Sequence, residues 1–92
     1  MKYKINDWIV FIDKKISKWR KKDYGISLYG KIGKIIDIDY NNKYIYYLVE
    51  FKEYINGYDG EGKGKDEHCR FCIDKEITLY KDYFKLKKLL NS

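Results

Sequence analysis

Residues 30–51 read Gly-Lys-Ile-Gly-Lys-Ile-Ile-Asp-Ile-Asp-Tyr-Asn-Asn-Lys-Tyr-Ile-Tyr-Tyr-Leu-Val-Glu-Phe, and this stretch predicts two adjacent β-strands. In its second half, positions 45, 47, 49 and 51 share one strand face and positions 44, 46, 48 and 50 share the other. Asn41-Asn42 predicts the hairpin turn between the strands, because asparagine tolerates positive φ. Strict alternation fails at Ile35-Ile36, where we expect a β-bulge.

Three further short apolar segments bring the expected strands to five. They are residues 7–12, 68–73 and 77–80, and a tight turn at 74–76 separates the last two. Residues 13–29 predict a long excursion with at most one helical turn. Residues 52–67 predict a mobile or ligand-approaching loop, because four glycines alternate with charged side chains there.

A brief helix is expected over residues 81–90, capped near Asp82. Tyr83, Leu86 and Leu90 fall on one face of that helix. The 92 residues lack Ala, Pro and Gln and are rich in Ile and Tyr, a composition that favours strands over a helical bundle. We therefore expect a mainly β protein: a small closed five-stranded barrel over residues 1–80, followed by a short C-terminal helix and tail over residues 81–92.

The net charge of +6 lies entirely in the first half of the chain. Residues 1–46 hold eleven basic and five acidic side chains, whereas residues 47–92 hold nine of each. This imbalance favours a polyanionic partner, either RNA or DNA or an acidic protein surface. No apolar run approaches the ~18 residues of a membrane span, and no signal peptide or disulfide framework is visible. We expect a cytoplasmic protein without a membrane partner.

The excess charge peaks in one short basic cluster. Six cations fall within nine residues there, around a tryptophan that could stack on a base. The alternative is a solvated segment that only keeps a lysine-rich protein in solution. The candidate binding residues are Lys14, Lys15, Lys18, Trp19, Arg20, Lys21 and Lys22.

Tyrosines form a second candidate surface. Tyrosine gives binding surfaces a large contact area at low entropic cost, although a thin barrel also uses aromatic rings on both faces for structure. The candidates for an aromatic binding face are Tyr24, Tyr29, Tyr44, Tyr46 and Tyr58.

The patterns for catalysis and metal binding are incomplete. Residues 57–63 match the start of a phosphate loop, but Gly64 stands where the magnesium-binding hydroxyl is required. The acidic residues of that loop miss calcium-loop spacing. His68, Cys69 and Cys72 offer three zinc ligands where a closed site needs four. The pair Asp37 and Asp39 favours a salt-bridged surface over a metal site. We expect no cofactor, no metal and no enzymatic activity.

Gly30, Gly33, Ile35 and Ile38, preceded by residues 7–10 (Asp-Trp-Ile-Val), resemble the KOW motif. This resemblance implies an SH3-like barrel and contact with RNA or a polymerase. Residues 48–80 are similar to small phage and prophage proteins that carry a glycine-rich loop followed by His-Cys, here at 68–69. Those proteins have an aromatic pair where this chain has Arg70-Phe71.

The second resemblance implies a mobile-element origin and assigns no activity. The hypothesis that combines it with the missing catalytic groups is a binding protein that inhibits or modulates a host nucleoprotein machine, such as a defence nuclease, as anti-CRISPR proteins do. The alternative is a KOW-type protein that binds RNA or DNA directly. The oligomeric state is left open.

Overall fold

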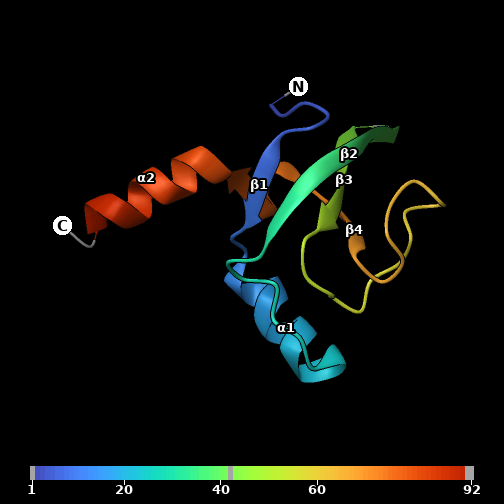
Figure 1. The fold of residues 1–92 in the computed structure, drawn as a ribbon, viewed down its shortest axis with the longest axis horizontal. Coiled ribbons are helices and arrows are strands. Elements are labelled where there is room, and N and C mark those ends of the chain that lie inside the picture. The colour runs from blue at the N-terminus through green and yellow to red at the C-terminus, as the bar shows by residue number, and fades with distance from the viewer. Residues whose placement is uncertain (1, 42, 91–92) are drawn as a thin grey trace.

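The chain folds into a mixed α/β domain whose centre is an antiparallel sheet (Figure 1). The computed structural model describes residues 2–41 and 43–90. Within them the elements follow the order β1 (Trp8–Phe11), α1 (Lys14–Tyr24), β2 (Ile32–Asn41), β3 (Tyr44–Phe51), β4 (Cys69–Cys72), the 3₁₀ turn η1 (Asp74–Glu76), β5 (Ile77–Leu79) and α2 (Tyr80–Leu90).

The sheet has the open strand order β4-β3-β2-β1-β5, and every neighbouring pair is antiparallel. The prediction of five strands is confirmed. We expected a closed barrel, but no pairing between the edge strands β4 and β5 is found in the part of the chain that the structure describes. The sheet is nevertheless curled, since the Arg70 guanidinium on the edge strand β4 lies 5.3 Å from the ring centre of Phe11 on β1, the neighbour of the other edge strand.

The hairpin of β2 and β3 agrees closely with its prediction. β3 begins and ends where the alternation predicts, and the register shifts between Ile35 and Asp37, which confirms the β-bulge. The bulge bends β2, so this strand can pair with β1 at one end and with β3 along its length. β2 ends at Asn41, which pairs with Tyr44. The predicted turn residue Asn42 lies outside the described residues.

The core lies on the inner face of the curled sheet. Tyr47, Val49 and Phe51 are buried there, as the alternation predicts, and Ile45 packs against them partly buried. Each fully buried side chain of this size contributes about 1.5–3 kcal/mol. The N-terminal segment joins this core, because the Tyr3 hydroxyl donates to the Ile77 carbonyl at 3.1 Å.

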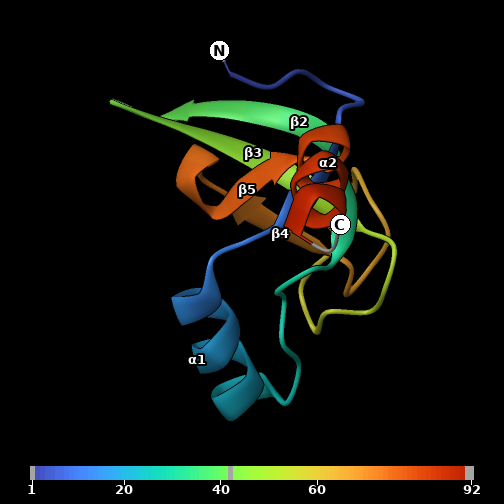
Figure 2. The ribbon, with the colours of Figure 1, turned by 90° about the vertical axis from the view of Figure 1, so that its left-hand side faces the viewer.

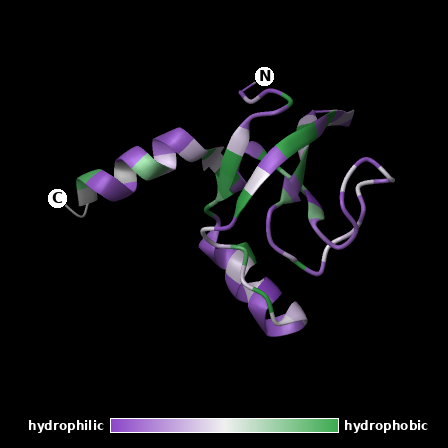
Figure 3. Ribbon diagram, in the orientation of Figure 1, coloured by the Kyte–Doolittle hydropathy of each residue, from purple (hydrophilic) through white to green (hydrophobic). Residues whose placement is uncertain are grey.

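α1 corrects the prediction for residues 13–29, since eleven residues are helical where we expected a single turn. Its ends are well defined. The Asp13 side chain accepts a hydrogen bond from the Ile16 amide at 2.9 Å, and Gly25 ends the helix with φ of 77°. α1 is predominantly hydrophilic (Figure 3) and points away from the sheet (Figure 2).

The glycine-rich loop between β3 and β4 packs on the outer face of the sheet. A Cβ at Gly57 would lie 2.3 Å from the Cys69 carbonyl oxygen, and one at Gly64 would lie 2.5 Å from the Cys69 sulfur. Gly60 lies against Leu48, which is thereby buried. We expected these glycines to serve a mobile or ligand-approaching loop, and in the structure they allow close approach between the loop and the strands.

The end of the sheet connects directly to α2. η1 occupies the predicted tight turn, and the Glu76 carboxylate accepts from the Ile73 amide at 3.0 Å and from Arg70 at 3.2 Å. α2 starts at Tyr80, at the end of β5 and two residues before the expected cap. It then extends away from the sheet (Figure 1). The side chains of Leu86 and Leu90, predicted to share a face with Tyr83, lie outside the described part of the structure.

Candidate binding surfaces

The basic cluster forms one side of α1. A shallow depression on this helix is lined by Trp19, a residue that is 49% exposed. The ring is held in place by Tyr24, whose centroid lies 5.6 Å away at an interplanar angle of 73°. The lysines that line the depression around Trp19 are Lys15, Lys18, Lys21 and Lys22. Cations around an aromatic ring are the arrangement that single-stranded nucleic acid requires.

Arg20 lies apart from that surface, although it belongs to the same cluster in sequence. It is only 7% exposed, and its guanidinium donates to the carbonyl oxygen of Ile55. Burial lowers the pKa of this guanidinium from its usual value, and the nearby Arg70 adds to the shift. Lys14, the first residue of the cluster, is also apart: its ammonium lies 5.4 Å from the centre of the Tyr29 ring.

The five candidate tyrosines occupy three separate places. Tyr24 lies on α1 beside Trp19, and Tyr29 precedes β2 near Lys14. Tyr44, Tyr46 and Tyr58 come together on the outer face of β3 and β4. The sequence therefore predicts one aromatic surface where the structure has several.

Phe71 joins the last three tyrosines into one continuous surface, which we call the aromatic row. Its centroid lies 6.5 Å from that of Tyr46 and 6.1 Å from that of Tyr58. Tyr44 extends the row, with its centroid 6.3 Å from that of Tyr46. Tyr44 is 62% exposed. Phe71 is a binding candidate that sequence reasoning missed. Its signal was available, because positions 46, 48 and 71 share a sheet face once β4 pairs with β3.

Carboxylates border the aromatic row. Asp39 pairs with Tyr46 across β2 and β3, and therefore lies on the same face. Asp59 and Glu61 follow Tyr58 in the loop. Burial raises the pKa of the Tyr58 phenol, and Glu61, Asp59 and Asp39 add to the shift, which places all three charges near the ring. Carboxylates thus lie beside the aromatic rings on this face, with Lys63 among them, whereas lysines line the depression on α1.

Asp37 and Asp39 do not form a free carboxylate pair. The Asp37 carboxylate is an ion-pair partner of Lys63 from the glycine-rich loop, and this contact holds its pKa below the usual value. Asp37 anchors the loop through its ion pair, as a salt-bridged surface requires, and Asp39 is a surface charge beside the aromatic row.

His68, Cys69 and Cys72 diverge. The His68 ring nitrogen Nδ1 lies 2.9 Å from the Phe51 carbonyl oxygen. Cys69 pairs with Glu50 and Cys72 with Tyr47, which places the two thiols on opposite sheet faces. Both are buried, and burial raises their pKa values to about 11 and about 12. Among residues 2–41 and 43–90 no group of three or more His, Cys, Asp or Glu side chains could hold a metal ion.

Comparison with known proteins adds nothing to this geometry: no family model, no curated protein and no solved structure matches the chain. Within the described residues, no helix combines the length and the apolar character that crossing a bilayer requires. The candidate surfaces are therefore judged on their own chemistry.

Proposed function

We propose that this protein is a non-catalytic binding protein that inhibits or modulates a nucleoprotein machine, such as a defence nuclease. The aromatic row with its bordering carboxylates carries the proposal. Aromatic side chains give a rigid contact area and recur as interface hot spots. The carboxylates would pair with the lysines and arginines through which a nuclease holds nucleic acid, so the protein would cover that surface.

The environment of the reactive side chains supports a binding role. The single histidine contacts a backbone carbonyl, the thiols are buried with raised pKa values, and Asp37 is paired with Lys63. These four side chains are therefore paired or buried within the fold. The resemblance of residues 48–80 to phage proteins favours a partner in the cytoplasm of a host cell.

We propose further that the domain is SH3-like, with a barrel that stays open between β4 and β5. Three features support this assignment: the strand order, the bent β2 that pairs on both sides, and the 3₁₀ turn that joins the last two strands. The fold itself assigns no partner, since one fold hosts many functions.

Inhibition of a nuclease tests the main proposal. Guide-RNA-loaded defence nucleases of several types are assayed for DNA cleavage with increasing amounts of the protein. We expect equimolar inhibition of one type, and loss of this inhibition in the double variant Tyr44→Ser/Tyr46→Ser. Tyr54→Ser, which removes an exposed tyrosine outside the aromatic row, is the matched control. Equal inhibition by the double variant, or none by the wild type across the panel, would contradict the proposal.

Direct binding of RNA or DNA is the second candidate function, and the lysines around Trp19 favour it. Fluorescence anisotropy with labelled RNA and DNA strands measures it. The expected signs are an affinity that falls steeply with salt and a loss of binding in Lys18→Glu/Lys21→Glu/Lys22→Glu. The matched control Lys75→Glu/Lys81→Glu/Lys85→Glu changes net charge equally at other exposed positions. Equal losses in both variants would mean that net charge alone drives the binding.

A further inference from the structure

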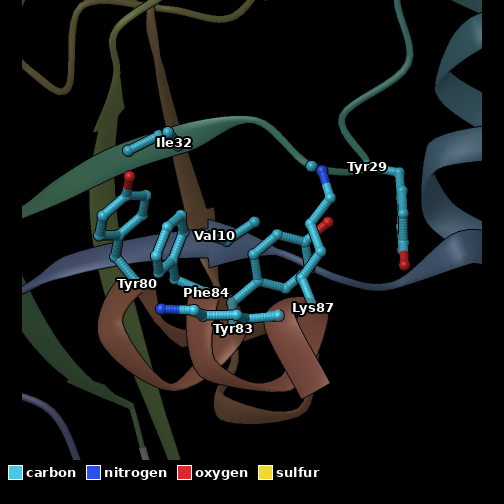
Figure 4. Close-up of a pocket in the computed structure, with 9 residues that line it drawn as sticks. Val10, Tyr29, Ile32, Tyr80, Tyr83, Phe84 and Lys87 are labelled. Carbon is cyan, nitrogen blue, oxygen red and sulfur yellow. The ribbon is translucent and has the colours of Figure 1, made fainter. Parts of the chain in front are cut away.

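A groove lies between α2 and the sheet, and aromatic side chains line it (Figure 4). Its volume is about 940 Å³. Tyr80, Tyr83 and Phe84 face it from α2, opposite Val10 of β1 and Ile32 of β2. A second depression of about 200 Å³ shares Ile32 and Tyr80 and adds Trp8 and Lys52. We call the two together the α2 groove.

The α2 groove has the apolar character of a binding site. Positions 80, 83, 84, 87 and 88 of α2 line it, the i, i+3, i+4, i+7, i+8 spacing by which a helix buries one face. Phe84 is nevertheless 57% exposed, and Tyr80, Tyr29 and Trp8 are exposed as well. Contiguous exposed apolar surface of this kind marks an interaction site more often than a free surface.

Unpaired lysines surround the apolar floor. Lys87 and Lys88 line the groove, and Lys14 lies over the Tyr29 ring. At the other end, the Lys52 and Lys34 ammonium groups lie 5.0 Å and 5.7 Å from the centre of the Trp8 ring. Among the described residues, none of these five lysines has a carboxylate within ion-pair distance, and neither depression is lined by an acidic side chain. Charge complementarity therefore calls for a negatively charged occupant with apolar groups.

Two kinds of occupant fit this description, a nucleic acid and an acidic protein segment with apolar side chains. The orientation of the rings distinguishes between them. Bases bind by stacking on free aromatic faces. Here Tyr80 and Phe84 stack on each other, with centroids 6.2 Å apart and an interplanar angle of 27°. Lysine ammonium groups lie 5.0–5.7 Å from the centres of the Tyr29 and Trp8 rings, where they compete with a base for the ring face. An apolar side chain can enter the groove without a free ring face, and carboxylates can pair with the covering lysines.

We propose that the α2 groove binds an acidic segment of a partner protein, with apolar anchor residues in the groove and carboxylates on the surrounding lysines. This site is separate from the aromatic row, which lies on β3, β4 and the loop between them, and it does not depend on the function proposed above. The α2 groove gives the protein a second contact surface. It prefers an acidic partner, whereas the aromatic row prefers a basic one.

Selection from a random peptide library tests the proposal. The library, displayed on phage, is panned against the immobilised full-length protein, and the most enriched peptide is synthesised and titrated by fluorescence anisotropy. We expect Asp or Glu beside Leu, Phe or Trp in the enriched sequences. Phe84→Ser should weaken the Kd of that peptide about 10-fold, the usual effect of losing a hot-spot ring. Lys87→Glu/Lys88→Glu should weaken it as well.

Two controls make these outcomes decisive. Lys81→Glu/Lys85→Glu changes the charge equally at exposed positions of α2 that do not line the groove, and should leave the Kd unchanged. An unchanged thermal melt for Phe84→Ser, expected for an exposed ring, shows that the fold persists.

Several results would overturn the proposal. They are enrichment without acidic residues, no enrichment at all, and a Kd that groove variants leave unchanged. If oligo(dT) displaces the peptide, and Phe84→Ser also weakens the binding of oligo(dT), then nucleic acid is the favoured occupant of the groove. A concentration-dependent dimer in sedimentation that Phe84→Ser abolishes would favour a second copy of this chain.

Discussion

Arg20 fastens the loop after β3 to α1. Its guanidinium donates to the Ile55 carbonyl, and Ile55 is itself fully buried. Replacing Arg20 by Met keeps the aliphatic volume but leaves that carbonyl without its charged donor. We expect Arg20→Met to lower the free energy of unfolding by about 1.5–3 kcal/mol. The adjacent exposed variant Lys21→Met should stay within about 0.5 kcal/mol of the wild type. Urea unfolding measures both, and equal midpoints would show that the contact is not structural.

Cys69 and Cys72 make the stability sensitive to alkaline pH. Burial raises their pKa values from 9.0 to about 11 and about 12, so the folded protein keeps protons that the unfolded chain loses first. The folded state then binds more protons than the unfolded state, and the free energy of unfolding falls as the pH rises above 9.0. The raised pKa values of Tyr3 and Tyr58 act in the same direction.

Urea unfolding at a series of pH values checks this prediction. The stability conferred by the thiols is fully present below pH 9.0 and is lost progressively above it. Cys72→Val, which keeps an apolar side chain at this core position, should flatten the decline. A stability that is constant or rising above pH 9.0 would contradict the assigned burial of the thiols.

At the scale of elements, α1 depends on its N-cap. Asp13 accepts from the Ile16 amide, and no other acidic side chain lies in the first turn. Asp13→Ala should therefore cost about 1 kcal/mol of stability, whereas Asp13→Ser should retain most of it. Asp23→Ala makes the same change at the other end of the helix and should cost less, since an acidic side chain is unfavourable there. Circular dichroism during thermal unfolding distinguishes them.

In the glycine-rich loop, the stability cost of a steric clash can be separated from the cost of a strained backbone conformation. Gly60 and Gly62 both have positive φ, 64° and 83°. A Cβ at Gly60 would lie 2.9 Å from Leu48, whereas nothing lies within 4 Å of one at Gly62. Gly62→Ala should cost about 1–2 kcal/mol for its backbone conformation alone, and Gly60→Ala should cost more. Similar losses in urea unfolding would mean that Leu48 moves aside readily.

These elements also show where prediction from the sequence ends. The β2–β3 hairpin was predicted with its bulge because strand burial appears directly as alternation. α1 was not, because its two buried residues, Ser17 and Arg20, are polar, and Ile16 is the one hydrophobic residue of the described helix that packs against the core. The available signals for its two ends were Asp13, which caps the first turn, and Gly25, which ends the helix in a left-handed conformation. The five strands and their central hairpin could thus be derived, but the open order of the sheet and a helix with polar buried residues could not.

The same limit holds for the surfaces of the whole molecule. Sequence proximity grouped Arg20 with the neighbouring lysines, but a helix turns successive residues to different sides. The five tyrosines were grouped by type, and only strand pairing separates them and adds Phe71. The α2 groove joins residues from both ends of the chain, such as Trp8 and Tyr80, so no local pattern could reveal it.

Charge asymmetry across the molecule should direct a polyanion to the lysines of α1 and of the α2 groove, and away from the aromatic row. Lysines gather on α1, whereas Asp39, Asp59 and Glu61 border the aromatic row. Because surface charges are screened beyond about 8–10 Å, the two faces should act independently. On a heparin column, Lys18→Glu/Lys21→Glu/Lys22→Glu should elute at lower salt than the wild type, whereas Tyr44→Ser/Tyr46→Ser should elute with it. The combined variant should elute with the α1 variant, since separate sites contribute additively. A lower elution salt for Tyr44→Ser/Tyr46→Ser would mean that heparin binds the aromatic row. That result would contradict the expected preference of heparin for the lysines.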